Sequence, residues 1–367
     1  KNNKFKELRN NYGRQEFDSD FKSVSKYKIK KIKNFSNFEP KIVFKSDGII
    51  FFEKQGTLKK YDYSQKLIWK KNFYSKQEKK SNILLNITHE NDILIITDNW
   101  SKYYAVDLKN GELLWSKTNL TPFNSQIKIY KDKFFIFNLN NNLICFSLKD
   151  GSKIWNFNTE KPFINPLKKL SIVIENNLVI FNNSLGDITA VNIESGALEW
   201  QISTHNSDDL NEIISLKTSN LIIDENKIFF SNNKNVFYSV DLITGNINWK
   251  QNVSSSVKPA VIGDLLFTIS DNGYLFLIDK NRGNIVRIND IFKNFKPKVK
   301  KNLVPTGFIL DSNNLYVSTN FGKLLIVNIE NASTKEILKI GKGKLSRPFV
   351  KNQNLFLIKD NAIIKLN

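Results

Sequence analysis

One short segment recurs along this 367-residue chain and constrains its fold more than any other feature. In residues 105–115, an alternating run ends at Asp107, a tight turn carries Gly111 in its last position, and a second apolar run closes on Trp115. Glycine at that point suits a hairpin turn that requires a positive φ. Five copies share this spacing, with the glycine four residues before the Trp position: Gly111 and Trp115, Gly151 and Trp155, Gly196 and Trp200, Gly245 and Trp249, and Gly283 and Arg287. Five hairpins in one register indicate a repeat architecture.

Each unit also contains two earlier β-rich runs, which are separated by a turn former six residues before the Asp position. These turn formers are Gly56, Ser101, Asn141, Gly186, Asn235, Gly273 and Gly322. Tryptophans at positions 69, 115, 155, 200 and 249 follow one another at intervals of 46, 40, 45 and 49 residues. This period is typical of a four-stranded propeller blade. We expect the tryptophans, including Trp69 at the start of the series, to pack between neighbouring blades rather than to stack on a ligand.

The repeats predict the number of blades. Seven copies occupy residues 41–75, 76–120, 121–160, 161–204, 205–253, 254–290 and 291–341, and the seventh is degenerate because Ala332 and Glu336 replace its Gly and Trp. The eighth copy, residues 342–367, supplies three strands, and the alternating segment 26–35 resembles the missing outer one. We therefore predict an all-β fold, an eight-bladed propeller of four-stranded antiparallel blades. An N-terminal strand would close its ring within the last blade and remove open strand edges. The polar residues 1–25 are expected to form a flexible tether.

The chain is basic, with 55 Lys and Arg against 35 Asp and Glu, a net charge of +20. Such a charge favours anionic partners, including nucleic acid, on whose bases aromatic side chains could stack. However, the alternation places lysines and aromatic residues on opposite strand faces, as in a solvated sheet over a packed core. We therefore expect no nucleic acid partner, and the charge also fits a general bias in composition. The single cysteine, Cys145, is expected to be a small buried side chain.

The repeat resembles that of the quinoprotein-like (PQQ-type) propellers, most closely in residues 186–200. WD-repeat propellers match less well, because no Asp follows the Trp positions here. Within this superfamily, residues 26–367 resemble the BamB family, the lipoprotein scaffolds of the outer-membrane β-barrel assembly machinery of Gram-negative bacteria. The resemblance implies a non-enzymatic protein on the periplasmic face of the outer membrane, attached through an upstream lipid anchor. Its implied partners are the barrel-inserting subunit, other subunits of the complex and unfolded barrel precursors.

The resemblance also implies contact residues in loops of the middle blades. The family carries a Leu-Arg pair after a proline, and the nearest match here places Lys168 in the Arg position. The family's Asp-x-Asp pair would fall near residues 215–217, where this chain has no acidic residue. With the nearest acids and the neighbouring apolar side chains included, the predicted partner-binding residues are Phe163, Ile164, Leu167, Lys168, Lys169, Asp208 and Asp209.

An enzymatic alternative is a PQQ-dependent dehydrogenase, because such enzymes share the propeller. They resemble one another in an adjacent cysteine pair, which a chain with only Cys145 cannot form. The sequence has no dense acidic cluster that suggests a calcium site, and His89 and His205 fall in different blades. It also lacks the hydrolase and phosphate-binding motifs. We therefore predict no catalytic, cofactor-binding or metal-binding residues and no small-molecule substrate.

Overall fold

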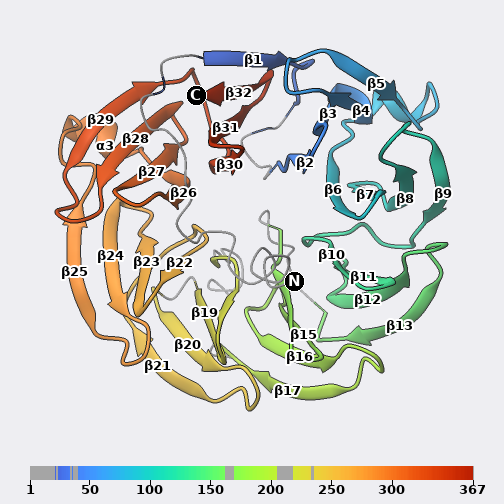
Figure 1. Cartoon of the computed structure of the whole chain (residues 1–367). Coiled ribbons are helices and arrows are strands. Elements are labelled where there is room, and N and C mark those ends of the chain that lie inside the picture. Colours follow the sequence, from blue (N-terminus) through green and yellow to red (C-terminus); the bar gives the residue numbers. More distant parts are fainter. Residues whose placement is uncertain are drawn as a thin grey trace.

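The protein is a ring of blades around a central axis, as predicted (Figure 1). The computed structural model describes residues 21, 24–33, 35, 40–161, 169–204, 218–232 and 235–366. The strands within these ranges form eight four-stranded antiparallel sheets. In seven of the sheets, the strands follow chain order from the axis to the rim. The predicted fold class is therefore confirmed.

Blades 1 to 4 lie between residues 43 and 202. Blade 1 contains β2 (Val43–Lys45), β3 (Gly48–Glu53), β4 (Thr57–Tyr61) and β5 (Leu67–Lys71), and blade 2 contains β6 (Leu85–Glu90), β7 (Ile93–Asp98), β8 (Lys102–Asp107) and β9 (Leu113–Thr118). Blade 3 contains β10 (Lys128–Tyr130), β11 (Lys133–Phe137), β12 (Asn142–Ser147) and β13 (Lys153–Asn158), and blade 4 contains β14 (Ile172–Glu175), β15 (Leu178–Asn182), β16 (Ile188–Asn192) and β17 (Leu198–Ile202).

Blades 5 to 8 complete the ring. Blade 5 contains β18 (Ile222–Asp224), β19 (Lys227–Ser231), β20 (Phe237–Asp241) and β21 (Ile247–Gln251), and blade 6 contains β22 (Ala260–Ile262), β23 (Leu265–Ile269), β24 (Tyr274–Asp279) and β25 (Ile285–Asp290). Blade 7 contains β26 (Pro305–Leu310), β27 (Asn314–Thr319), β28 (Lys323–Asn328) and β29 (Thr334–Lys339), and blade 8 contains β30 (Phe349–Lys351), β31 (Asn354–Lys359), β32 (Ala362–Leu366) and β1 (Val24–Lys28).

Helices are confined to short turns in the described part of the chain. They are the 3₁₀ turns η2 (Lys54–Gly56) and η3 (Glu78–Lys80) and the single-turn helix α3 (Pro297–Lys300). None of the helices in the described ranges has the length and apolar character needed to span a membrane.

The last blade joins the two ends of the described chain. Strand β1 pairs antiparallel with β32, so the N-terminal strand is the outermost strand of blade 8 (Figure 1). This strand covers residues 24–28, whereas the sequence analysis placed it within 26–35 and assigned Val24 and Ser25 to the tether. The position is set by Tyr27, whose side chain is 1% exposed and packs edge-on against Tyr61 of blade 1. Phe21, which was also assigned to the tether, packs edge-on against Tyr316 of blade 7. Residues 1–20, 22 and 23 lie outside the described residues.

The turn between the third and fourth strands of a blade explains why the sequence repeats Asp and Gly. In blade 2, the Asp107 carboxylate accepts hydrogen bonds from the backbone N–H groups of Lys109 at 2.7 Å and Asn110 at 3.2 Å. The Gly111 N–H donates to the Asp107 carbonyl at 2.8 Å, and Gly111 has a φ of +73°. Glycine is favoured in this left-handed conformation because a Cβ would approach the backbone carbonyl. The same turn recurs in blades 5 and 6.

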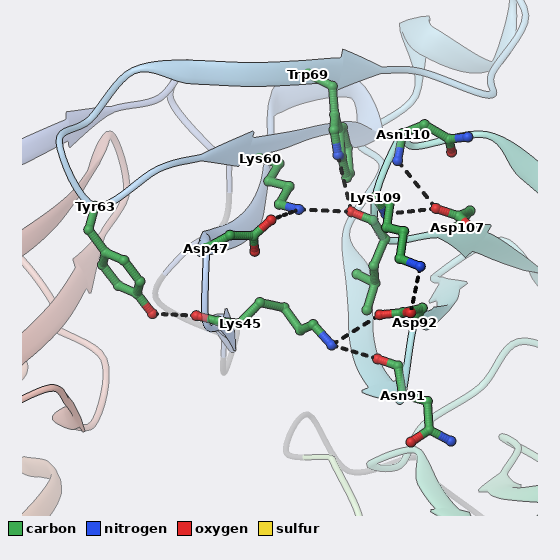
Figure 2. Close-up of polar contacts among 11 residues, drawn as sticks. Lys45, Asp47, Lys60, Tyr63, Trp69, Asn91, Asp92, Asp107, Lys109 and Asn110 are labelled. Atoms are coloured by element: carbon green, nitrogen blue, oxygen red, sulfur yellow. Dashed lines mark hydrogen bonds and ion pairs between the residues drawn. The ribbon is translucent and has the colours of Figure 1, made fainter.

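The outer Trp side chain of one blade binds the turn of the next blade. In Figure 2 the Trp69 indole N–H of blade 1 donates to the Leu108 carbonyl of blade 2 at 3.3 Å. The ring also packs on the turn glycine, because a Cβ on Gly111 would lie 3.0 Å from the Trp69 ring. The same N–H to carbonyl bond joins four further pairs: Trp115 and Leu148, Trp155 and Ile193, Trp200 and Leu242, and Trp249 and Lys280. These tryptophans therefore lie between blades.

Two other side chains make this contact where the tryptophan is missing. In blade 6 the Arg287 guanidinium donates to the backbone carbonyls of Ile329 and Glu330 in blade 7. In blade 8 the Tyr27 hydroxyl donates to the Tyr63 carbonyl of blade 1 at 3.4 Å. Tyr63 follows Asp62 as Leu108 follows Asp107, so the acceptor has the same place in the repeat. The contact thus tolerates different donors as long as the acceptor carbonyl is retained.

The apolar core consists of layers between adjacent blades. Middle strands such as β3 and β27 are buried along their whole length, which explains why they read as continuous apolar runs in the sequence. One layer packs Ile95 and Ala105 of blade 2 against Phe134 and Phe146 of blade 3. Near the axis, neighbouring first strands contact one another, as β2 does with β6 and β10 with β14. This packing fixes the inner ends of the blades around the axis.

Candidate functional site

Most of the predicted partner-binding residues lie outside the described residues. These are Phe163, Ile164, Leu167, Lys168, Asp208 and Asp209, and their assignment stays a prediction. Lys169 is described, is partly buried, and directly precedes Leu170. Leu170 forms an isolated parallel bridge with Ser125 of blade 3, and its N–H donates to the Asn124 carbonyl at 2.9 Å. The described end of this predicted contact segment is therefore anchored to the preceding blade.

A buried polar turn of blade 4 lies between the two predicted contact segments in the sequence. The Asn183 side chain donates to the Asp187 carboxylate at 2.9 Å, and the Ser184 hydroxyl donates to the Asn141 side chain of blade 3. Thr204, the last described residue before the second segment, donates from its hydroxyl to a carbonyl of the turn at 2.6 Å. Buried polar groups require such partners, and a network that satisfies them is rigid. This network holds Thr204, which precedes the second segment, against the turn of blade 4.

A cavity of about 270 Å³ lies at the axis of the ring. Its walls come from blades 1, 3, 5, 6, 7 and 8, so no single blade forms it. Four basic side chains line it, from Lys41, Lys258, Lys344 and Arg347, and none of the described residues that line it is acidic. The cavity is slightly smaller than the pockets of roughly 300–1,000 Å³ that hold drug-sized ligands. We call it the axial pocket.

The basic surroundings of the axial pocket lower the pKa of Lys258 in its lining and of Lys128 nearby. Burial, and then Arg347, Lys128 and Lys41, hold the pKa of Lys258 well below its usual range. Burial and Arg347 also lower the pKa of Lys128, the first residue of β10, to about 8. Both effects disfavour the charged form of a lysine, the first through desolvation and the second through repulsion. Lys41, Lys128 and Arg347, from blades 1, 3 and 8, therefore lie within electrostatic range of Lys258 of blade 6.

The Arg347 backbone approaches the axis because blade 7 provides space for it. A Cβ on Gly307, in the first strand of blade 7, would lie 2.4 Å from the Arg347 Cβ. Glycine at this position thus allows the close contact between the two blades. The Arg347 guanidinium lies 5.0 Å from the ring centroid of Phe349, which is within the range of a cation–π interaction. These contacts fix the position of the arginine on the pocket wall.

The axial pocket is not among the sites predicted from the sequence, although several residues of its lining share a position in the repeat. Lys41, Lys258 and Arg347 each lie two residues before the first strand of their blade. Gln126 and Asn220 also line the pocket, and they lie two residues before β10 and β18. Once the strand boundaries are known, aligning this one position across the repeats shows that it is basic in three blades.

The remaining candidates for chemistry do not form a centre in the described part of the chain. No group of three or more His, Cys, Asp or Glu side chains that could hold a metal ion occurs among the described residues. Cys145 is buried in β12, and burial raises the pKa of its thiol to about 12. A thiol that stays protonated at neutral pH is a poor nucleophile and a poor metal ligand.

The fold and the repeat define an eight-bladed propeller of the quinoprotein-like class. Residues 54–289, more than half of the chain, match the family described as "Outer membrane protein assembly factor BamB". The chain belongs to this family, which confirms the resemblance inferred from the repeats.

Solved structures show the same fold. BamB from Moraxella catarrhalis superposes with a TM-score of 0.75 at 16% sequence identity, over 94% of this chain and 100% of that one. A quinohemoprotein alcohol dehydrogenase from Pseudomonas putida HK5 superposes with a TM-score of 0.69 at 11% identity, over 98% of this chain and 78% of that one. At these identities the superpositions show a common fold and no common activity.

Curated relatives include dehydrogenase subunits. The dehydrogenase subunits of the quinone alcohol dehydrogenases of Komagataeibacter europaeus and Acetobacter aceti are each 27% identical over 135 residues. Each match covers 30% of this chain and spans only 18% of the length of the relative. The matched part is therefore a stretch of the propeller repeat.

Proposed function

We propose that this protein is a non-enzymatic scaffold subunit of the machinery that assembles β-barrel proteins in the outer membrane, on the periplasmic face of that membrane. The observation that carries the proposal is the family match over residues 54–289. A propeller provides a rigid disc whose connecting loops form broad surfaces for partners, and such loops carry function on many folds. The partners would be the barrel-inserting subunit, other subunits of the complex and unfolded barrel precursors.

The contact to the barrel-inserting subunit is assigned to the loops beside blade 4, with Phe163, Ile164, Leu167, Lys168, Lys169, Asp208 and Asp209 as contact residues. The polar turn of blade 4 supports this assignment, because hydrogen bonds hold Thr204 to Gly186 of the turn and Asn183 to Asp187 within it. A fixed base lowers the entropy lost when a loop is ordered by a partner. Apolar side chains surrounded by charge are also the usual composition of an interface centre.

The test of this site is the double variant Leu167→Ala with Lys168→Glu. We expect it to lose co-purification with the barrel-inserting subunit, because truncation of a central anchor costs roughly 2 kcal/mol or more of binding free energy. The matched control is Ile154→Ala with Lys153→Glu, an exposed apolar and basic pair on the outer strand β13. Both variants should melt within a few degrees of the wild type. Equal recovery of the partner by both variants would move the contact away from residues 163–169.

We assign the binding site for unfolded barrel precursors to the outer strands at the rim of the ring. The outer strands expose apolar side chains, including Leu114 at 49%, Leu198 at 51% and Val286 at 60% of their accessible surface. Within the described residues each sheet ends at its outer strand, and the edge of such a strand can accept an extended segment as an additional strand. Cross-linking from a photoreactive residue at position 114 to an unfolded barrel precursor should exceed cross-linking from position 163. The opposite ranking would place the precursor on the loops.

A second candidate function is a PQQ-dependent dehydrogenase, which the quinone alcohol dehydrogenase relatives favour. The described residues contain no acidic cluster for a calcium ion, and Cys145 is the single cysteine of the chain. Calorimetric titration with pyrroloquinoline quinone and calcium distinguishes the two functions. The scaffold requires no stoichiometric binding, and a one-to-one heat of binding would establish the dehydrogenase candidate instead.

A further inference from the structure

The connection between blades 6 and 7, residues 291–304, is rich in lysine. It contains five lysines and no acidic residue. One of them, Lys300, forms an ion pair with Asp290, the last residue of β25. The other four are exposed: Lys293, Lys296, Lys298 and Lys301. The acidic residue that precedes the connection is thus engaged with Lys300, and the four exposed lysines make this surface strongly basic.

Blade 7 adds two apolar side chains to this basic surface. The Asn320 side chain donates to the Asn302 carbonyl at 2.9 Å, and the Asn320 N–H donates to the Val304 carbonyl at 3.1 Å. These bonds hold the turn between β27 and β28 against the connection. Phe321, the next residue of the turn, is 42% exposed, and Val304 is 37% exposed. An aromatic and an aliphatic side chain are therefore exposed beside the lysines.

The connection between blades 7 and 8 lies against the same turn. The N–H groups of Ile340 and Gly341 donate to the Gly322 carbonyl at 2.9 and 3.1 Å. Lys339, at the end of β29, and Lys342 are both exposed. We call the resulting surface the basic patch, and it consists of Lys293, Lys296, Lys298, Lys301, Val304, Phe321, Lys339 and Lys342.

We propose that the basic patch binds the surface of an anionic lipid bilayer, an inference that goes beyond the proposed function. Lysines near such a surface are attracted by the negative potential of its headgroups. The exposed rings and methyl groups of Phe321 and Val304 can enter the boundary between headgroups and acyl chains. The long apolar stems of the lysines allow this, because they keep the ammonium groups among the headgroups. The patch therefore combines electrostatic attraction with a small apolar contact.

The composition of the patch favours lipid over a protein or a nucleic acid. Its cations are all lysines, and neither connection contains an arginine. Protein interfaces are enriched in arginine and depleted of lysine. Arginine is also favoured for nucleic acid, because its planar group pairs with base edges and stacks on rings. A bilayer instead presents a diffuse negative field, to which point charges on flexible stems are suited.

The test measures flotation of the full chain with vesicles of equal amounts of phosphatidylglycerol and phosphatidylcholine, and with vesicles of phosphatidylcholine alone. We expect binding to the anionic vesicles, which weakens as sodium chloride is added because salt screens the attraction. The variant that combines Lys296→Gln, Lys298→Gln and Lys301→Gln should bind at least about tenfold more weakly, since each lysine near an anionic surface contributes roughly fivefold. Vesicle binding requires no partner protein, so its outcome is independent of the proposed function.

A matched control removes the same charge elsewhere on the ring. It combines Lys117→Gln, Lys149→Gln and Lys153→Gln, which are exposed lysines of blades 2 and 3. This control should bind the anionic vesicles nearly as the wild type does, and both triple variants should keep the wild-type melting temperature. An equal loss of binding in the two triple variants would show that binding follows the net charge of the chain, and it would overturn the proposal.

The apolar contact has its own variant, Phe321→Ala. It should reduce the binding that remains at high salt, because salt does not screen an apolar contact. Unchanged binding at high salt would contradict the entry of this ring into the bilayer.

Three further results overturn the proposal. They are equal binding of the wild type to neutral and anionic vesicles, the absence of binding to both, and wild-type binding by the Lys296, Lys298 and Lys301 variant. Binding of a single-stranded DNA oligonucleotide that this variant loses, without vesicle binding, would assign the patch to nucleic acid instead. If the variant does not fold, Lys339→Gln with Lys342→Gln replaces it, and wild-type vesicle binding by that variant overturns the proposal.

Discussion

The Trp200 indole N–H of blade 4 donates a hydrogen bond to the Leu242 carbonyl of blade 5 at 3.1 Å. The Trp200 ring is 8% exposed, and it packs on Gly245, at which a Cβ would lie 2.7 Å from the ring. One contact therefore combines a buried hydrogen bond, a large buried aromatic surface and a turn that only glycine adopts without strain. Its repetition around the ring explains the spacing between Gly and Trp in the sequence.

We predict that Gly245→Ala destabilises the protein more than Gly263→Ala does. Both glycines have a positive φ, +74° and +57°, so both variants incur about 1 kcal/mol or more of backbone strain. Only at Gly245 does the added Cβ meet a neighbour, because nothing lies within 4 Å of the Cβ position at Gly263. Overpacking against the Trp200 ring should cost a further 1–3 kcal/mol or so. Denaturant midpoints of the two variants check this, and equal midpoints would show that the Trp contact adapts freely.

The sequence predicted the repeat because the turn and the Trp contact recur at fixed positions in each blade. It did not predict the position of the closing strand. Residues 26–35 alternate in a way that fits more than one register, and a shift along the strand changes which side chains are buried. The structure selects residues 24–28 because Tyr27 takes the place of the tryptophan and bonds Tyr63. A search for tryptophan at this position of the repeat does not find a tyrosine in the same role.

The axial pocket was not predicted, for a different reason. Lys41 and Arg347 are separated by most of the chain and meet only because the ring closes. In the sequence each is one of 55 basic residues, and nothing distinguishes it from a lysine on the rim. The distinguishing property is a position in the repeat, two residues before the first strand. That position becomes identifiable only after the strand boundaries are known.

Ring closure gives a second prediction. Removal of residues 1–28 deletes β1 and the fully buried Tyr27, whereas removal of residues 1–20 leaves the strand in place. An aromatic side chain of this size buries about 150–250 Å², so the loss should approach 4–6 kcal/mol as an upper estimate. We therefore expect a clearly lower denaturant midpoint for the longer truncation and a nearly wild-type midpoint for the shorter one. Equal midpoints for the two truncations would contradict closure by β1.

The buried thiol of Cys145 gives a prediction on pH. Burial raises its pKa from 9.0 to about 12, so the native state keeps the thiol proton at pH values where the unfolded chain releases it. The stability that this proton provides is complete below pH 9 and is lost as the pH rises from 9 towards 12. The free energy of unfolding should therefore fall more steeply over this range in the wild type than in Cys145→Ala. At pH 8, iodoacetamide should label Cys145 only after unfolding, and labelling of the native protein would show that the site opens.

The contact between blades 6 and 7 differs from the others at both of its partners. Arg287 replaces the tryptophan, and Ala332 replaces the turn glycine with a φ of +54°. At the five turns that carry glycine and face a tryptophan, a Cβ on the glycine would lie 2.6–3.0 Å from the Trp ring. The Cβ of Ala332 is therefore compatible with Arg287 and incompatible with a tryptophan at position 287. The two replacements are therefore expected to be coupled.

A double-mutant cycle tests this coupling. Arg287→Trp alone should destabilise the protein by about 1–3 kcal/mol, because the ring would meet the Ala332 Cβ and the bonds to the Ile329 and Glu330 carbonyls would be lost. Ala332→Gly alone should change the stability little, since relief of backbone strain offsets the greater freedom of the unfolded chain. The double variant should recover most of the loss, with an interaction free energy of about 1 kcal/mol or more in favour of the pair. Additive effects in this cycle would mean that the tryptophan and the glycine were replaced independently.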